Sequence, residues 1–215
     1  MTRVRVHNFF ISLDGFGTGE GQSLERPFGH AGMGLQSWFF GTRTFRAMQG
    51  QSDGSTGIDD RFAAAWGVGV GAEIMGRNKF GPQRGPWTDD GWRGWWGDEP
   101  PFHTPVFVLT HYPRPPIEMA GGTTFHFLDA SPADALAVAT EAAGGLDVRI
   151  GGGVTTVREF LAADLIDELH AVMAPIVLGR GERLWDGAEG LEDRFTIEST
   201  SSPSGVTHLV MQRRR

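Results

Sequence analysis

The sequence predicts a mixed α/β fold with a mostly parallel central sheet, helices on both faces and a C-terminal antiparallel hairpin. Strand-like and helix-like segments alternate along most of the 215 residues. A strand-like segment at 147–150 runs through three glycines into a helix-like segment at 154–163. Two strand-like segments within 195–212 are separated only by a short Pro-Ser-Gly turn. No linker or internal repeat interrupts this pattern, so a single domain is expected to span residues 1–215.

The expected strands are short and either apolar or alternating, and they end at turn-forming residues. They lie at 4–13, 72–75, 105–110, 123–128, 147–150, 166–178, 195–201 and 206–212. The segment at 166–178 is a long apolar run, which is typical of a strand buried on both faces.

Three helices are expected between these strands. The first begins at Asp60 with Asp59 as its cap, and its core-facing stripe consists of Phe62, Ala65 and Trp66. The second begins at 131–134, where a capping serine, a proline and an acidic residue follow the usual order of a helix start, and it runs to Ala143. The third occupies 154–163.

Two long segments, at about 15–57 and 81–104, show no clear periodicity and are expected to be mostly loop. Glycine accounts for 32 of the 215 residues, about twice its usual share of roughly 7 %. Three of the seven tryptophans lie within 92–96. The tryptophans of 87–96 could form a stacking wall for a flat substrate, a packed loop cover or a dimer contact.

Composition excludes several classes of function. The formal net charge of -7 argues against a nucleic-acid or anionic-membrane partner, and the terminal Arg213-Arg214-Arg215 is interpreted as a solvated tail. The absence of cysteine removes disulfides and thiolate chemistry. The seven histidines show no zinc-site spacing, so no metal is expected. With neither a signal-peptide core nor a long apolar span, a cytoplasmic protein is expected.

The glycine run Gly151-Gly152-Gly153 suggests an anion site. It lies where a strand ends and a helix begins, so the backbone can approach a ligand and the first N–H groups of the helix can point at it. Such a place suits a pyrophosphate. A tight turn that binds nothing is an equally good interpretation of this motif alone, because it lacks the G-x-G-x-x-G spacing.

Two further strands end in groups suited to phosphate. Met75-Gly76-Arg77 places a guanidinium after one strand, and Thr110-His111 with Arg114 follows the next. In open α/β sheets ligands gather at the carboxyl ends of strands, so the three strand ends are expected to form one cradle.

These motifs together resemble the dihydrofolate reductase superfamily. The similarity is greatest to the reductase domain of the bifunctional riboflavin-biosynthesis deaminase-reductase and its stand-alone relatives. It rests on Ser12-Leu13-Asp14-Gly15, Met75-Gly76-Arg77, Leu109-Thr110-His111 and Ile150-Gly151-Gly152-Gly153, in that order. Leu165-Ile166-Asp167-Glu168-Leu169-His170, followed by Ala174-Pro175-Ile176-Val177-Leu178-Gly179, strengthens it. The resemblance covers nearly the whole chain.

The resemblance implies a dihydrofolate-reductase-like fold, NADPH as cofactor and a homodimer. It places the phosphates beside Gly76 and Arg77, the 2′-phosphate near Thr110 and His111, and the pyrophosphate at the glycine run. The positions expected at the cofactor are Gly76, Arg77, Asn78, Thr110, His111, Arg114, Gly151, Gly152, Gly153, Val154 and Thr155.

The 12–16 segment resembles the strand end and mobile loop that cover the nicotinamide. Asp14 is therefore the candidate acid or water-positioning residue, and a turn-forming role before Gly15 is equally compatible with it. The residues expected at the substrate are Ser12, Gly15, Phe16 and Trp38.

Two departures from dihydrofolate reductases bear on the substrate. Val154 stands where those enzymes usually carry an arginine, and the acid that grips the pterin has no secure counterpart, since Asp60 is interpreted as a capping residue. The family implies 5-amino-6-(5-phosphoribosylamino)uracil as the leading substrate. A dihydrofolate or other pterin reductase, and a non-catalytic NADPH-binding module, are the alternatives.

Overall fold

The computed structural model describes residues 2–89 and 91–214, so Met1, Asp90 and Arg215 lie outside the described residues. Those described form two compact units. The first unit contains residues up to Val6 and Gly69–Asp167, and the second contains His7–Val68 and the residues from Glu168 onward. Each unit is described separately below.

The first unit is built on a mainly parallel sheet. Its strand order is β1-β7-β3-β4-β6-β5, in which the first residues of β1 pair with β7. The strands are β1 (Val4–Ser12), β3 (Val70–Gly76), β4 (Pro105–Leu109), β5 (Ile117–Glu118), β6 (Thr124–Leu128) and β7 (Asp147–Gly152). All neighbours except β5 and β6 run parallel. The predicted parallel sheet is confirmed, and only the two-residue β5 was not predicted.

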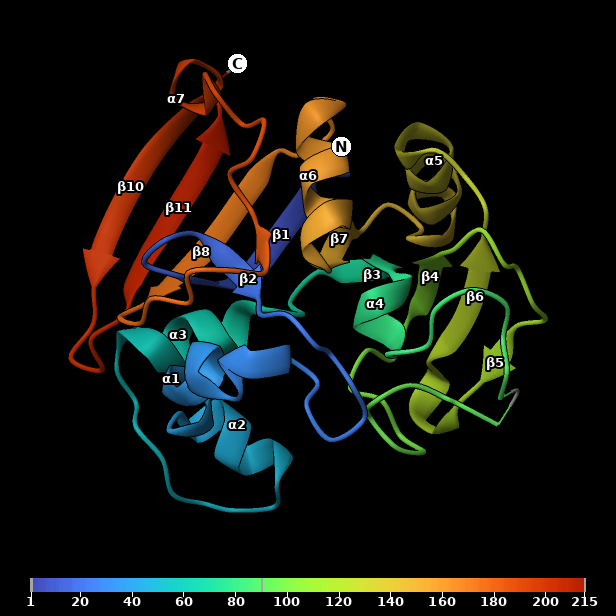
Figure 1. The fold of residues 1–215 in the computed structure, drawn as a ribbon, viewed down its shortest axis with the longest axis horizontal. Coiled ribbons are helices and arrows are strands. Elements are labelled where there is room, and N and C mark those ends of the chain that lie inside the picture. Colours follow the sequence, from blue (N-terminus) through green and yellow to red (C-terminus); the bar gives the residue numbers. More distant parts are fainter. Residues whose placement is uncertain (1, 90, 215) are drawn as a thin grey trace. The chain divides into compact units, whose positions relative to one another are not determined.

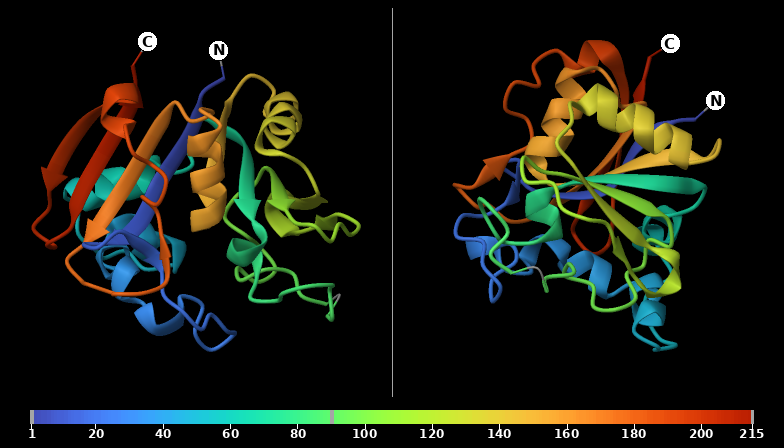
Figure 2. Two further views of the ribbon diagram at one scale, coloured as in Figure 1. Left: turned by 45° about the horizontal axis from the view of Figure 1, so that its top comes forward. Right: turned by 90° about the vertical axis from the view of Figure 1, so that its right-hand side faces the viewer.

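Helices α5 (Pro132–Ala142) and α6 (Val154–Ala162) lie on one face of this unit's sheet (Figure 2). Helix α5 begins as predicted, because the Ser131 side chain accepts a hydrogen bond from the Asp134 N–H and Pro132 occupies the first turn. Val157, Phe160 and Leu161 of α6 are buried, as its apolar spacing requires. The short helices α4 (Arg77–Phe80) and η3 (Ala120–Gly122) complete the unit.

The second long segment, 81–104, contains neither helix nor strand in its described part. Three of its tryptophans pack on a buried apolar cluster that includes Met75, Phe80 and Phe125. They are Trp87, Trp92 and Trp96. Of the alternatives for these tryptophans, the packed loop cover fits this arrangement.

In the second unit, the strand order is β10-β11-β8-β1. Strands β10 (Phe195–Ser201) and β11 (Thr207–Arg213) form the predicted C-terminal hairpin, and β11 also pairs antiparallel with β8 (Glu168–Ala174) (Figure 1). Strand β8 is shorter than the predicted 166–178, because Pro175 cannot donate to a ladder and the chain leaves the sheet there. Strands β2 (Phe16–Thr18) and β9 (Glu182–Arg183) form a separate pair.

The segment 15–57, which was expected to be mostly loop, also contains short elements that were not predicted. This segment holds β2 and four short helices: η1 (Gly29–Ala31), η2 (Gly34–Gln36), α1 (Ser37–Phe40) and α2 (Arg43–Met48). Each is at most six residues long, too short for a helical period to appear in the sequence. The remaining helix of this unit, apart from α3, is α7 (Leu191–Arg194).

Helix α3 (Ile58–Ala65) begins two residues before the predicted start, with Gly57 as its N-cap. The predicted capping roles of Asp59 and Asp60 are therefore wrong. Asp59 lies within the first turn and bonds to His208, and Asp60 accepts hydrogen bonds from the Thr44 N–H and hydroxyl. Both carboxylates, those of Asp59 and Asp60, form hydrogen bonds with residues outside the helix and not with its free N–H groups.

The predicted core stripe of α3 is also shifted. Ala63 is its buried apolar residue, whereas Phe62, Ala65 and Trp66 are only half-buried. Within the described residues, no helix combines the length and the apolar character needed to cross a membrane.

Candidate functional site

Three strand ends meet in the first unit. In the parallel pairings, Gly76 of β3 is level with Leu109 of β4, and Met75 is level with Gly152 of β7. The residues that follow these strands therefore gather at one edge of the sheet. Arg77 Nη1 lies 3.4 Å from Thr110 Oγ1, within hydrogen-bonding range. The structure thus brings together the strand ends that the sequence singled out.

The glycines at this edge are needed for different physical reasons. A Cβ on Gly151 would overlap Glu73 Oε1, and one on Gly76 would overlap Thr156 Oγ1. Gly152 has a φ of +115°, which side chains rarely adopt, and the Gly152-Gly153 peptide bond is cis. A Cβ on Gly153, in contrast, would meet nothing within 4 Å. Packing therefore explains Gly151 and Gly76, and the open space lies beside Gly153.

Gly153 is also the N-cap of α6, and it provides no side-chain bond to the helix. The first N–H groups of a helix have no partner within it, so those of Val154 and Thr155 can serve an anion. The side chain of Val154 is buried, and Thr155 is exposed. Together with the open space at Gly153, this end of α6 can hold a pyrophosphate through backbone donors.

Gly151→Ala is expected to destabilise the protein by about 1–3 kcal/mol, because the methyl group would displace the buried Glu73 carboxylate. Gly153→Ala is the matched control and should change the free energy of unfolding by less than about 1 kcal/mol, since its Cβ faces open space at a φ of -69°. Urea unfolding monitored by circular dichroism measures both. Equal losses of stability in the two variants would show that the overlap with Glu73 does not cause the destabilisation at Gly151.

Arg77 is the best-placed cation of this edge. Its guanidinium carbon lies 3.8 Å from the ring centroid of Trp87 and 5.4 Å from that of Tyr112. Its Nε and Nη2 are buried and have no hydrogen-bond partner among residues 2–89 and 91–214. Burial first, and then the charge of Arg84, lower the pKa of Arg77 from its ordinary value, but a guanidinium stays charged at neutral pH. Two of its nitrogens thus remain available to an anionic ligand.

The other predicted cofactor residues lie in the same unit with different surroundings. Thr110 is buried and Asn78 is half-buried in the first turn of α4. Arg114 donates to the Trp92 carbonyl at 2.7 Å and lies 4.0 Å from the Trp87 ring centroid. His111 is exposed and lies 3.0 Å from Asp129 Oδ1. Arg77, Thr110 and Arg114 therefore form one group, and His111 is directed to Asp129.

In the second unit, Asp14 forms part of a closed turn. Its carboxylate accepts hydrogen bonds from the Ser12 hydroxyl at 2.6 Å and from the N–H groups of Leu178 and Gly179 at 3.1 and 2.7 Å. The Ser12 bond, together with the backbone bonds, lowers the pKa of Asp14 to about 2. An ionised Asp14 favours the water-positioning role over the role as an acid. Its role in positioning a water stays a prediction.

The predicted substrate residues are largely enclosed within the second unit. Ser12, Phe16 and Trp38 are buried, and the Ser12 hydroxyl accepts a hydrogen bond from the Phe16 N–H. A Cβ on Gly15 would lie 2.7 Å from Trp185. Packing accounts for these residues within the unit, and their contact with substrate stays a prediction.

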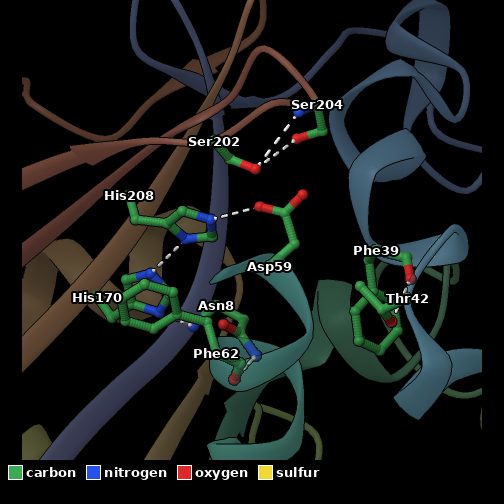
Figure 3. Close-up of polar contacts among 9 residues, drawn as sticks. All are labelled: Asn8, Phe39, Thr42, Asp59, Phe62, His170, Ser202, Ser204 and His208. Atoms are coloured by element: carbon green, nitrogen blue, oxygen red, sulfur yellow. Dashed lines mark hydrogen bonds and ion pairs between the residues drawn. The ribbon is translucent and has the colours of Figure 1, made fainter. Parts of the chain in front are cut away.

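Sequence reasoning missed a buried chain of polar groups in the second unit (Figure 3). His208 Nε2 lies 2.8 Å from Asp59 Oδ1, and His208 Nδ1 lies 3.0 Å from His170 Nε2. The Asn8 N–H donates to His170 Nδ1 at 3.2 Å. Phe62 stacks on both imidazoles, with centroid distances of 4.2 and 4.3 Å. No spacing in the sequence could reveal this chain, because it joins β1, α3, β8 and β11.

The direction of the hydrogen bonds follows from the Asn8 N–H, which can only donate. His170 Nδ1 must then accept, so His170 Nε2 carries the proton and donates to His208 Nδ1, and His208 Nε2 donates to Asp59. Burial, followed by the neighbouring His208 and His7, lowers the pKa of His170 to about 3. Burial by itself would raise the pKa of Asp59, but hydrogen bonds from Ser202, His208 and Ser204 lower it. The chain thus runs from the Asn8 N–H through the two imidazoles to the ionised carboxylate of Asp59.

No group of three His, Cys, Asp or Glu side chains in the described part of the chain could hold a metal ion. The polar chain from Asn8 to Asp59 is linear and does not converge on one point.

A comparison with protein families decides the relationship. The RibD C-terminal domain matches residues 4–208, nearly the whole chain. The chain belongs to this family. Membership in the RibD C-terminal family confirms the resemblance inferred from the strand-end motifs and the 165–179 segment. A comparison with curated proteins finds no match.

Solved structures related to the RibD C-terminal family share the fold at low sequence identity. A putative riboflavin biosynthesis protein from Shewanella sp. PV-4 is 23 % identical with a TM-score of 0.58, and the match covers 100 % of both chains. A pyrimidine reductase-like protein from Corynebacterium diphtheriae is 15 % identical with a TM-score of 0.52, covering 100 % of this chain and 92 % of the other.

The diaminohydroxyphosphoribosylaminopyrimidine deaminase/5-amino-6-(5-phosphoribosylamino)uracil reductase of Thermotoga maritima is a longer relative. It is 13 % identical with a TM-score of 0.53, and the match covers 99 % of this chain but 57 % of that one. The chain therefore corresponds to little more than half of that bifunctional protein. These likenesses confirm the predicted dihydrofolate-reductase-like fold.

Proposed function

We propose that the chain is an NADPH-dependent reductase of a small pyrimidine-type substrate, with 5-amino-6-(5-phosphoribosylamino)uracil as the leading candidate. The observation that carries the proposal is the convergence of β7, β3 and β4 at one edge, which gathers the glycine run, Arg77 and Thr110. Family membership supports the same reaction class. A homodimer and a cytoplasmic location remain predictions.

The residues of the first unit fit NADPH in two ways. The open space beside Gly153, at the uncapped start of α6, suits the pyrophosphate. Arg77, with two buried nitrogens that lack hydrogen-bond partners within residues 2–89 and 91–214, suits the 2′-phosphate. Thr110 lies within hydrogen-bonding range of it, and Arg114 contacts the same Trp87 ring. When bound, NADPH supplies a hydride for a C=N or masked carbonyl carbon of the substrate.

The protein's own contribution is orientation and electrostatics. Backbone donors at Val154 and Thr155 bind one phosphate group without a charged side chain, which offsets the absence of an arginine at 154. The arginines fix the other end of the dinucleotide. Asp14, being ionised, is proposed to position a water and not to protonate the substrate.

The decisive experiment follows NADPH oxidation at 340 nm with three candidate substrates: the phosphoribosylaminouracil, its dephosphorylated form and dihydrofolate. Turnover of a ribosylaminouracil supports the proposal. Turnover of dihydrofolate alone would identify a pterin reductase. Tight NADPH binding without oxidation by any of them would identify a binding module.

Arg77→Ala is expected to weaken NADPH about 100-fold while changing NADH less than about threefold, because only NADPH carries the 2′-phosphate. Isothermal titration calorimetry with both nucleotides measures the difference. Arg93→Ala is the control, since that guanidinium donates to the Glu118 carbonyl, and it should keep the preference for NADPH. Equal weakening of both nucleotides by Arg77→Ala would remove Arg77 from the 2′-phosphate site.

A further inference from the structure

We propose that Trp87 is a positioning residue that fixes the two arginines of the phosphate site and thereby sets the preference for NADPH over NADH. This inference rests on the proposed function and assigns a role to the long segment 81–104. It concerns a residue that touches the arginines, not the nucleotide.

Trp87 is itself held in place on three sides. Its indole N–H donates to the Tyr112 carbonyl, at a distance of 2.5 Å. Its ring packs edge-on against Phe80 and Phe127, with centroid distances of 6.0 and 5.4 Å. Phe80 and Phe127 belong to the buried apolar cluster of the first unit. The indole is therefore a rigid surface, although it belongs to a segment without helix or strand.

Two guanidinium groups rest on this one ring. The guanidinium carbon of Arg77 lies 3.8 Å from the Trp87 centroid, and that of Arg114 lies 4.0 Å from it. Arg77 follows β3 and Arg114 follows β4, so the ring joins cations from two neighbouring strand ends. The negative face of an indole attracts a guanidinium and offsets the repulsion between like charges. Trp87 thus contacts both guanidinium groups at once.

The segment 81–104, which contains Trp87, makes a second contact with Arg114 through Trp92. The Trp92 carbonyl accepts a hydrogen bond from Arg114 Nη2 at 2.7 Å. Arg114 also lies 4.5 Å from the Phe127 centroid. Arg77 Nε and Nη2 are buried and have no hydrogen-bond partner among the described residues. One arginine is tied to the segment and the other presents free donors beside it.

This arrangement suits a phosphate monoester, which carries close to two negative charges at neutral pH. Side chains that are already ordered lose less entropy on binding, so a fixed pair of guanidiniums gains affinity for such a group. NADH carries no phosphate at this position and gains nothing from the arrangement. Loss of the indole should therefore weaken only those ligands that contain the 2′-phosphate.

The test compares Trp87→Leu and Trp87→Phe with Trp96→Leu. Trp96 packs on Phe102 and Phe125 of the same unit, and the cation over its ring is Lys79, at 6.0 Å, so it controls for loss of loop packing. Calorimetry gives the Kd of each variant for NADPH, NADH, adenosine 2′,5′-bisphosphate and adenosine 5′-monophosphate. Thermal melts followed by circular dichroism confirm that each variant is folded.

Trp87→Leu should weaken NADPH and the bisphosphate about tenfold and change NADH and the monophosphate less than about twofold. Trp87→Phe should recover part of the loss because a ring remains, and Trp96→Leu should leave the preference unchanged. Retention of the wild-type preference in Trp87→Leu, or equal weakening of all four ligands, would overturn the inference and leave the proposed function intact. A wild type with no preference for NADPH would overturn both.

Discussion

Replacing Arg149 with methionine is expected to lower the free energy of unfolding by about 3–5 kcal/mol. Arg149 of β7 and Glu73 of β3 are cross-strand neighbours, and their side chains form an ion pair. Both are almost fully buried, with 5 % and 1 % of their surface exposed. Burial lowers the pKa of Arg149, and the charge of Glu73 opposes this shift. The substitution would leave the Glu73 carboxylate buried without its main partner.

Urea unfolding followed by tryptophan fluorescence and circular dichroism measures this loss. The double variant Glu73→Leu/Arg149→Met should regain most of the stability, because an apolar pair of similar volume carries no desolvation cost. Arg180→Met is the exposed control. Arg180 pairs with Glu20 where both side chains are 64 % exposed, so its loss should cost less than about 1 kcal/mol. Similar losses for Arg149→Met and Arg180→Met would contradict the argument.

This ion pair marks a limit of what the sequence could predict. The strands at 72–75 and 147–150 were predicted from short apolar patterns, and both are present in the structure. Their side-by-side register, which sets Glu73 opposite Arg149, depends on pairing between segments 76 residues apart. The local sequence pattern predicts that a segment is a strand, but it does not predict which strand lies beside it. Glu73 and Arg149 could therefore each be seen as a charged residue in an apolar strand, but not as partners.

The first helix was misplaced for a related reason. Aspartate before an apolar stripe usually caps a helix, and that rule predicted Asp59 at the cap. The hydrogen bonds that Asp59 makes with His208 and the hairpin serines compete with capping, and the helix starts earlier, at Ile58. Tertiary contacts override the local preference where a carboxylate has a better partner elsewhere in the chain.

The candidate cofactor site was more predictable, because its signals are strand ends. In a parallel sheet the carboxyl ends of neighbouring strands share one edge, so Gly76, Thr110 and Gly152 could be placed together before any coordinates. The supporting role inferred for Trp87 could not be predicted. Its segment has no periodicity, and its contacts with Arg77 and Arg114 arise only from tertiary packing.

The stability of the protein is expected to fall by roughly 3 kcal/mol between pH 6.5 and pH 4 through His170 alone. In the folded protein the pKa of His170 is lowered to about 3, whereas an unfolded histidine titrates near its ordinary value of 6.5. Between these values the unfolded chain binds a proton that the folded chain refuses, so stability rises with pH across the window and is lost as the pH falls. The folded chain does not bind this proton because both imidazole nitrogens are already engaged. His170 Nδ1 accepts a hydrogen bond from the Asn8 N–H, and His170 Nε2 lies against His208.

His170→Gln separates this contribution from the other acidic and basic groups. Glutamine has one acceptor and two donors and does not titrate, so it can replace the neutral imidazole in the polar chain. Urea unfolding at pH 7, 6, 5 and 4 should show a steep loss of stability for the wild type and a flatter curve for His170→Gln. His111→Gln removes a histidine whose side chain is 90 % exposed, and its curve should run parallel to that of the wild type. Parallel curves for the wild type and His170→Gln would mean that the buried imidazole accepts a proton in the folded state, against the bonding direction that Asn8 imposes.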